Sequence, residues 1–285
     1  MPHLSIVIPL YNKEKEIHTT LKSVLSQSFS DFEVVIVNDG STDGSVREVE
    51  RFADRRIRIV TQENAGVSAA RNQGIREATG RYILLLDADD TLMPGAFDVM
   101  KKPHTEDLVM CSFIETKTGG EIYKKSIHKY EGVVENPFRS LCRKELFVRI
   151  GSCFIRRDWL DGKEGFRTDL RQYEDDEWHY RIMDGATIYS STECILSYNR
   201  GETGLSRGIS PIEKDFVSTV VLRRVRDKYL RCILGDYIFR RFARRLQIGD
   251  WKGVRRIYCN NPFMITYCAV CCVYRTLLER IKARS

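Results

Sequence analysis

The first hundred residues alternate between short apolar segments typical of buried strands and segments with apolar residues at helical spacing. The helical segments include Ile17 to Leu25, Ser45 to Ala53 and Ser68 to Ala78. Parallel strands need crossover connections and become buried on both faces, so this alternation predicts an α/β fold with a mostly parallel sheet flanked by helices. The expected strands are Leu4 to Leu10, Phe32 to Val37, Arg56 to Thr61 and Tyr82 to Leu86.

Polar residues follow three of these strands. Tyr11 and Asn12 come after the first strand, Asn38-Asp39-Gly40 ends the second, and Asp87-Ala88-Asp89-Asp90 follows the fourth. Ligands of open α/β sheets bind beyond the carboxyl ends of the strands. We therefore expect these polar groups to line one crevice.

The segment "LLLDADD" places three carboxylates within four residues at the end of a leucine strand. Such carboxylates repel one another unless a cation or hydrogen-bond donors offset their charge. Mg²⁺ and Mn²⁺ favour hard oxygen ligands, and Mg²⁺ typically takes one or two carboxylates together with substrate phosphates. The alternative is a solvated acidic turn in which Asp90 or Thr91 caps the next helix.

Four segments occur in order over residues 4–90: "SIVIPLYNKEKEI", "SVLSQSFSDFEVVIVNDGSTDGS", "ENAGVSAARNQGI" and "GRYILLLDADD". Together they resemble the nucleotide-binding half of the family 2 glycosyltransferases, which adopt the GT-A fold. The resemblance implies an inverting transfer of a sugar from a nucleoside diphosphate to a hydroxyl, with Mn²⁺ or Mg²⁺ as cofactor.

The resemblance also implies roles for single residues. Asp39 would accept a hydrogen bond from N3–H of uracil, Asp87 would hold the ribose and Asp89 would ligate the metal. Without the resemblance, the alternative interpretation is that Tyr11 is an aromatic residue at a strand end and that Asp39-Gly40 forms a common turn. The residues assigned to nucleotide-sugar binding are Pro9, Tyr11, Asn12, Asp39, Arg71, Asp87 and Ala88.

The segment "QYEDDEWHYRIM" suggests the general base that an attacking hydroxyl requires. By resemblance the base belongs to the pair Glu174-Asp175, and we nominate Asp175. Asp176 and Glu177 are adjacent competitors, and His179 is a lone histidine more typical of a structural role. The alternative is an acidic first helical turn, which the helix dipole favours.

The region from 107 to 205 would supply the acceptor half. Its pattern predicts a strand over Asp107 to Ile114, a helix over Tyr173 to Met183, and two short strands over Ile188 to Ser190 and Ile195 to Asn199. The segment "YNRGETGLSR" resembles the family more loosely, and it is either a surface loop or a contact to the diphosphate or acceptor. The residues concerned are Arg200, Ser206 and Arg207, and Glu174 is a fourth residue expected to contact the diphosphate or acceptor.

Positive charge is concentrated near the C-terminus. Residues 223–256 carry 12 lysines and arginines against 3 acidic residues, whereas residues 1–222 carry 30 against 35. With the uncharged stretch Phe263 to Tyr274, which is too short to span a bilayer, this charge suits a helical segment on an anionic membrane surface. The alternative is a core helix, and no nucleic-acid-binding module is recognisable.

The predicted organisation is a GT-A domain over residues 1–210, divided into a nucleotide-sugar half (1–106) and an acceptor half (107–210), followed by a basic, mainly helical region (211–285). The N-terminal segment lacks the pattern of a signal peptide, so we expect a cytoplasmic protein, peripheral on the inner face of the cell membrane.

The expected reaction is transfer of a sugar, with UDP as the expected carrier, to a glycan or lipid-linked glycan in cell-surface polysaccharide synthesis. One rival is a sugar-phosphate nucleotidyltransferase, although "PLYNKEKEI" lacks a glycine-rich phosphate loop. Another is an inactive nucleotide-sugar-binding scaffold, because a fold alone does not establish a function.

Overall fold

The computed structural model describes residues 1–117, 120–200 and 210–266. The chain divides into two compact units, each described below by itself. The first comprises Met1–Asp169 with Glu174–Arg207, and the second comprises Leu170–Tyr173 with Gly208–Ser285.

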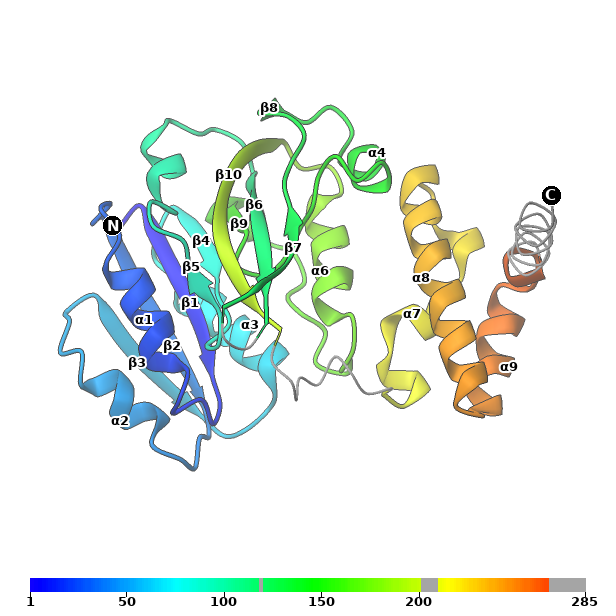
Figure 1. Ribbon diagram of the computed structural model, residues 1–285, viewed down its shortest axis with the longest axis horizontal. Coiled ribbons are helices and arrows are strands. Elements are labelled where there is room, and N and C mark those ends of the chain that lie inside the picture. The colour runs from blue at the N-terminus through cyan, green and yellow to red at the C-terminus, as the bar shows by residue number, and fades with distance from the viewer. Residues whose placement is uncertain (118–119, 201–209, 267–285) are drawn as a thin grey trace. The chain divides into compact units, whose positions relative to one another are not determined.

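A single sheet organises the first unit, with the strand order β3-β2-β1-β4-β9-β6-β10-β5 and with β7 and β8 paired to β6 and β10 (Figure 1). The strands β1 to β4 are parallel to one another, whereas β9 runs antiparallel between β4 and β6. The strands in the described residues are β1 (Leu4–Leu10), β2 (Phe32–Asp39), β3 (Ile57–Gln62), β4 (Tyr82–Leu85), β5 (Thr91–Leu92), β6 (Leu108–Thr116), β7 (Ile122–Ser126), β8 (Gly132–Val133), β9 (Cys153–Arg156) and β10 (Ile188–Asn199).

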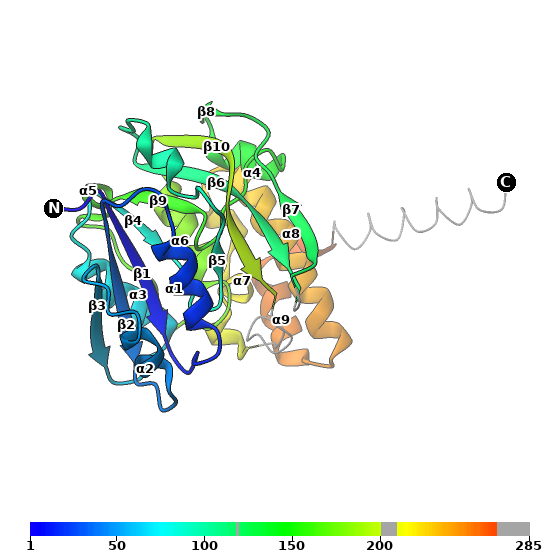
Figure 2. The ribbon, with the colours of Figure 1, turned by 60° about the vertical axis from the view of Figure 1, so that its left-hand side comes forward.

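Successive side chains of a strand point to opposite faces of the sheet, so strands that are apolar throughout need cover on both faces. Helices supply this cover on both faces of the sheet. The even-numbered residues of β1 pack in one apolar core with α1 and α2, and Figure 2 shows α1 in front of β1. On the other face α3 lies close to β1, since a Cβ on Gly74 would stand 2.1 Å from Cγ1 of Val7. The helices of this unit are α1 (Ile17–Leu25), α2 (Ser45–Glu50), α3 (Val67–Glu77), α4 (Pro137–Cys142), α5 (Arg157–Leu160) and α6 (Glu174–Met183), with a 3-10 turn at Asp98–Lys101.

The predicted α/β architecture with a largely parallel sheet is confirmed, and its first four strands lie where the sequence pattern places them within two residues. The two short strands expected over Ile188 to Ser190 and Ile195 to Asn199 are one strand, β10. Register shifts between Ser191 and Leu196 interrupt its pairing with β6, and this bulge breaks the apolar alternation in the sequence.

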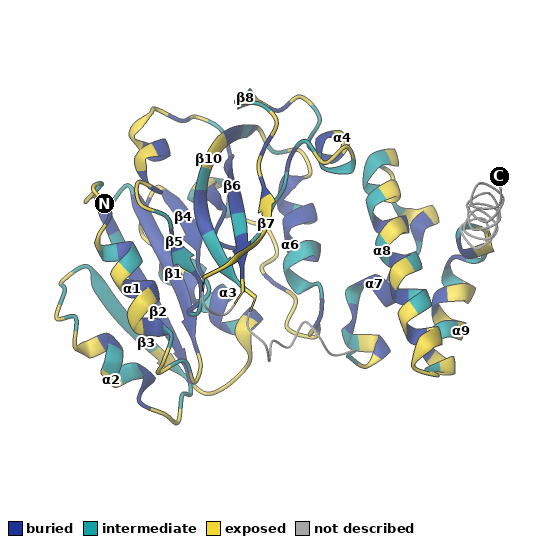
Figure 3. Cartoon of the chain, in the orientation of Figure 1, coloured by how far each residue is buried: buried dark blue, intermediate teal, exposed yellow. Residues whose placement is uncertain are grey.

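The second unit contains α7 (Phe216–Thr219), α8 (Lys228–Gln247) and α9 (Trp251–Asn260), with 3-10 turns at Ile212–Lys214 and Leu222–Arg224. Asp215 is fully buried between Arg241 and Arg245, at 2.9 and 3.0 Å. Figure 3 shows buried and exposed faces alternating along α8 and α9. Among the described residues, no helix has the length and apolar character needed to cross a membrane.

Candidate active site

β1 and β4 separate at their carboxyl ends, and the edge beyond them is the place of the expected crevice. Their last bond runs from the Leu86 amide to the Val7 carbonyl, at 2.9 Å. Pro9 lies two residues further along the same edge of β1, and it has no N–H with which to continue the pairing. Since β2 lies on the other side of β1, this is the switch point at which such sheets bind ligands. Tyr11, predicted to line the base pocket, follows here with 47% of its surface exposed.

Side-chain hydrogen bonds join the loops that follow β1 and β2. Asn12 adopts a positive φ of 50°, and its Oδ1 accepts from the Thr42 amide at 2.8 Å while its own amide donates to Ser41 Oγ at 3.2 Å. The next amide, that of Lys13, donates to Ser45 Oγ at 2.7 Å. Asn12 therefore shapes this edge of the crevice through its hydrogen bonds to the neighbouring loop.

Asp39 lies at the end of β2 with only 2% of its surface exposed. Its Oδ1 accepts from Gln62 Nε2 at 2.7 Å and from the Ala65 amide at 2.9 Å, and its Oδ2 accepts from the Gly66 amide at 2.9 Å. A carboxylate has about four acceptor sites, so one remains for a ligand. The structure thus gives Asp39 a role in fixing the loop before α3, which its position in the motif does not reveal.

Arg71 on α3 connects the carboxylates after β4 with those at the start of α6. Its Nη2 donates to Asp87 Oδ1 at 2.7 Å, and its Nη1 lies 3.9 Å from Glu174 Oε1. Burial opposes the charge of Arg71, but the surrounding carboxylates, led by Asp87, outweigh that cost and raise its pKa. The Nε and Nη1 atoms are buried without a hydrogen-bond partner, and Nη1 is the one that lies near Glu174.

Two residues that the sequence analysis did not single out hold Arg71 in place. Phe166 lies with its ring 5.3 Å from the guanidinium carbon of Arg71 and stacks on Trp178 at 4.1 Å. Asn72, next to Arg71 on α3, exchanges two hydrogen bonds with the Phe166 backbone, at 2.7 and 2.8 Å. In the sequence, only the position of Asn72 next to Arg71 in the motif could have indicated this role.

Asp89, the predicted metal ligand, accepts from Lys13 Nζ at 2.6 Å, and about a third of each side chain is exposed. Thr20 on α1 fixes the adjoining backbone, since its hydroxyl lies 2.9 Å from the Ala88 carbonyl and 2.7 Å from that of Asp90. Ala88 itself is buried, and its carbonyl is held by Thr20.

Asp90, the third carboxylate of "LLLDADD", is buried and turned away from solvent. Burial, followed by repulsion from Asp87 and Asp89, holds its pKa well above the usual range. Its Oδ1 accepts from the Asn199 amide at 2.9 Å, at the end of β10. This residue therefore ties the strand ends together and is a poor candidate for a metal ligand.

The first turn of α6 carries four acidic residues with different surroundings. Glu177 forms a bidentate pair with Arg181, at 2.7 and 2.9 Å. Burial and the neighbouring Asp175 raise the pKa of Asp176 well above its usual range, and the same two causes raise that of Glu174. Asp175, the predicted base, accepts from the Asp176 amide through Oδ1 at 2.9 Å.

Arg149 is a second, half-buried cation beside this turn, and no sequence motif points to it. Its guanidinium carbon lies 3.6 Å from the centre of the Tyr198 ring, and its charge acts on Asp175 and Asp176. His179 lies on the same helix, and burial lowers its pKa to about 4 although Asp175 opposes this shift. A histidine held neutral by burial fits the structural role expected for it.

Arg200, at the end of β10, is engaged by its own neighbours. It lies 3.9 Å from Glu115 and 4.4 Å from the centre of the Tyr123 ring. The other two residues expected to contact diphosphate or acceptor, Ser206 and Arg207, lie outside the described residues.

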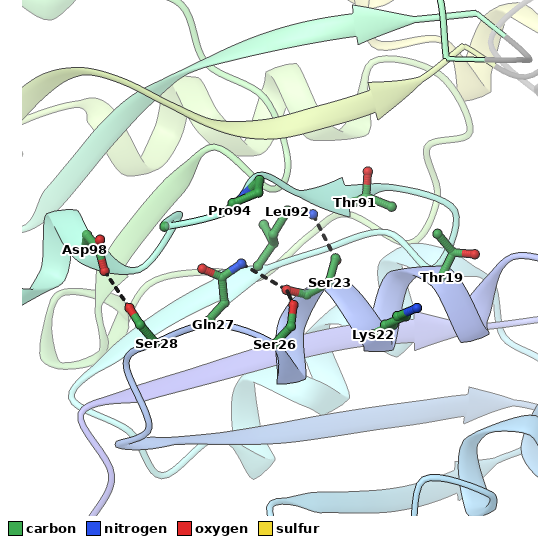
Figure 4. A pocket seen from close by; sticks show the side chains of 11 residues that line it. Thr19, Lys22, Ser23, Ser26, Gln27, Ser28, Thr91, Leu92, Pro94 and Asp98 are labelled. Carbon is green, nitrogen blue, oxygen red and sulfur yellow. Dashed lines mark hydrogen bonds between the residues drawn. The ribbon is translucent and has the colours of Figure 1, made fainter.

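A groove of about 510 Å³ lies elsewhere, between α1 and β5 (Figure 4). Its polar side chains bond to one another or to nearby backbone, as Gln27 does to the Ser23 and Met93 carbonyls and Ser28 to Asp98. None of the predicted site residues lines it, so it is separate from the crevice.

Solved structures share the fold. Staphylococcus aureus TarS 1–349 in complex with UDP-GlcNAc aligns over 84% of this chain and 72% of its own, with a TM-score of 0.67 and 21% identity. The mannosyltransferase PcManGT of Pyrobaculum calidifontis, in complex with GDP-Man and Mn²⁺, aligns over 99% of this chain and 80% of its own. Its TM-score is 0.57 and its identity is 19%. These structures support the GT-A architecture.

Curated relatives align over part of their length. Chondroitin synthase of Escherichia coli is 38% identical over 221 residues, which are 75% of this chain and 31% of the relative. The uncharacterized glycosyltransferase EpsJ of Bacillus subtilis is 33% identical over 177 residues, 54% and 52% of the two chains. The chain thus spans about a third to a half of these relatives.

The family model described as glycosyl transferase family 2 matches residues 5–162. This match covers more than half of the chain and contains β1 to β4 with the residues of the crevice. The chain belongs to glycosyl transferase family 2.

Proposed function

We propose that the chain is an inverting glycosyltransferase that moves a hexose from a nucleoside diphosphate, with UDP as the carrier, to a hydroxyl of a glycan or lipid-linked glycan. One observation carries the proposal. Arg71, which is buried, brings Asp87, after β4, and Glu174, at the start of α6, into one partly buried cluster. The donor-binding edge of the sheet and the candidate base therefore adjoin, as transfer from a bound donor to an acceptor requires.

The donor would bind across the carboxyl ends of β1, β2 and β4. Tyr11 is exposed enough to contact a base, and Asp39 retains an acceptor site for N3–H of uracil. The unpartnered Nη1 of Arg71 would donate to a nucleotide or phosphate oxygen, for which a guanidinium fork is suited. The UDP-GlcNAc complex of TarS supports a UDP-sugar donor, and the relative chondroitin synthase supports a glycan acceptor.

A divalent cation fits the residues present. No three His, Cys, Asp or Glu side chains within the described ranges converge on one point, so the protein alone does not build a closed metal cage. Asp89, at the exposed end of β4, offers one carboxylate, and Mg²⁺ is commonly held by one or two carboxylates plus substrate phosphates. When bound, the ion would offset charge on the leaving diphosphate.

The chain's own groups would perform the rest of the reaction. Arg71 binds and orients the donor, and Asp175 removes the acceptor proton as the hydroxyl oxygen attacks the anomeric carbon from the face opposite the diphosphate. Burial and the neighbouring Asp175 raise the pKa of Asp176, so we assign the role of base to Asp175 rather than to Asp176.

A donor panel tests this function. The purified chain is incubated with UDP-, GDP- and dTDP-sugars, Mn²⁺ and candidate acceptors, and release of the nucleoside diphosphate is measured. We expect release with a UDP-sugar, and we expect Asp89→Ala to weaken nucleotide binding in the presence of Mn²⁺. Absence of binding by every donor, together with an unchanged affinity in Asp89→Ala, would refute the proposal. Release of pyrophosphate from a nucleoside triphosphate would instead indicate a nucleotidyltransferase.

We also propose that α9 holds the protein on an anionic membrane surface at the cytoplasmic side. This helix contains no acidic residue, and it buries Gly253 and Ile257 while Trp251 is 68% exposed. The exposed face forms a groove of about 500 Å³. Aromatic rings beside basic groups are typical of helices in a lipid interface. The groove is lined by Trp251, Lys252, Arg255, Arg256 and Cys259.

Co-sedimentation with vesicles tests the membrane proposal. Vesicles in which about a third of the lipid is the anionic phosphatidylglycerol should bind the wild type, whereas vesicles of pure phosphatidylcholine should not. The double variant Arg255→Gln/Arg256→Gln should lower partitioning by about thirtyfold, from roughly 1 kcal/mol per basic residue. Arg244→Gln, an exposed arginine of α8, is the matched control. Equal binding of the double variant and this control would refute the proposal.

A further inference from the structure

The ion pair between Lys13 and Asp89 crosses the mouth of the crevice. Lys13 follows β1 and Asp89 follows β4, and these two strands separate at the switch point. The Nζ to Oδ2 distance is 2.6 Å. The backbone of Lys13 is fixed by Ser45, at 2.7 Å, so the ammonium reaches Asp89 from a held position rather than from a free loop.

This pair places a cation on the carboxylate that the proposed function assigns to the metal. A divalent ion and the Lys13 ammonium would therefore compete for Asp89 Oδ2. The diphosphate of the donor brings further negative charge to the same edge, and an ammonium on a flexible stem can exchange one oxygen partner for another.

We propose that the Lys13 ammonium forms an ion pair with Asp89 before the donor binds. When the donor is bound, the ammonium pairs with the diphosphate instead. The inference rests on the proposed function, because it requires a diphosphate and a divalent ion at this edge. In the empty site Lys13 holds the Asp89 side chain in position, and it lowers the affinity for a metal ion that arrives without nucleotide. Once the donor is bound, the same ammonium adds a positive charge beside the phosphates.

Two binding measurements on Lys13→Met test the inference, because the proposal predicts effects of opposite sign. Mn²⁺ binding without nucleotide is followed by electron paramagnetic resonance of the free ion. UDP binding in EDTA is followed by calorimetry. K13M should tighten Mn²⁺ binding about two- to fivefold and weaken UDP binding by a similar factor, as expected for a partly exposed ion pair.

Lys15→Met is the matched control, because Lys15 is an exposed lysine two residues away and the variant removes the same charge. It should leave both affinities unchanged. Lys13→Arg should retain wild-type behaviour in both measurements, and circular dichroism establishes that each variant is folded.

Three outcomes overturn the inference: K13M binds Mn²⁺ no more tightly than the wild type, K13M binds UDP in EDTA as well as the wild type, or K15M reproduces both effects. A purely structural Lys13 would weaken both ligands together. Failure of the wild type to bind any nucleoside diphosphate would count against the proposed function, whereas the Mn²⁺ measurement would still decide whether Lys13 competes for Asp89.

Discussion

Arg71 donates to Asp87 at 2.7 Å while only 5% of its side chain is exposed, so a buried arginine of α3 neutralises a carboxylate at the end of β4. Breaking a buried ion pair by removing one partner leaves an uncompensated charge. Arg71→Met should therefore lower the free energy of unfolding by about 3–5 kcal/mol, measured by urea denaturation. Arg76→Met, at an exposed position of the same helix, should change it by less than about 0.5 kcal/mol.

The Arg71→Lys variant distinguishes the contribution of the positive charge from that of the paired donor groups of the guanidinium. A lysine can replace one hydrogen bond to Asp87 but cannot also direct a second donor toward a ligand oxygen. We expect this variant to retain most of the stability and to weaken UDP binding by about tenfold, the loss of one charge-assisted hydrogen bond. Wild-type UDP affinity in this variant would show that Arg71 is structural only.

The strand-end residues could be predicted from the sequence because their position depends on backbone topology alone. Once β1, β2 and β4 are parallel neighbours, Asn12, Asp39 and Asp87 must lie at one edge. The partners of these residues could not be predicted in the same way. That Asp39 is held by the amides of the loop before α3 depends on how that loop closes, and hydrophobic periodicity carries no information on it.

The strand β9 (Cys153–Arg156) was missed for a different reason. It has only four residues, and it is inserted antiparallel between β4 and β6, which the alternation of strands and helices in the first hundred residues does not imply. The different surroundings of Asp175, Asp176 and Glu177 could likewise not be predicted from the sequence. Adjacent acidic residues of one helical turn differ only in what the fold packs against each of them.

Asp175→Asn and Asp176→Asn compare the two candidates for the base. Loss of a general base typically costs 10²- to 10⁴-fold in rate, so Asp175→Asn should lower kcat by about that factor while UDP-sugar affinity changes by less than about twofold. Asp176→Asn should have a small effect on kcat, because burial already favours the neutral form of Asp176. Single-turnover kinetics at saturating donor provide the comparison, and equal losses in the two variants would contradict the assignment.

Asp39→Asn and Gln62→Ala separate the two roles of Asp39. The asparagine replaces one acceptor oxygen by an N–H₂ group facing donors, so it should destabilise the fold by about 1–3 kcal/mol and weaken UDP binding. Gln62→Ala removes one donor, at 2.7 Å, and leaves the carboxylate for the base. It should lower stability by about 1 kcal/mol and preserve the preference for UDP over GDP. A loss of that preference in Gln62→Ala would place base selectivity in the loop rather than in Asp39.

His128 makes the stability of the first unit depend on pH. Its ring nitrogens bond to Ser190 Oγ and to the Phe147 carbonyl, at 3.0 and 2.9 Å. Burial lowers its pKa to about 4 from 6.5, so the unfolded chain binds this proton at a higher pH than the folded chain does. Stability from this group is complete above pH 6.5 and falls as the pH decreases toward 4, by up to about 3 kcal/mol.

His128→Gln provides the test, because glutamine has no proton to gain in this range. At pH 7.5 the variant should be less stable than the wild type by about 1–3 kcal/mol, since its amide cannot reproduce both hydrogen bonds. At pH 5 the difference should shrink or reverse, because the wild type then loses stability at His128 and the variant does not. Urea denaturation at the two pH values measures both differences. A gap that stays constant between them would mean that His128 is accessible to protons in the folded chain, and that its hydrogen bonds alone account for its contribution.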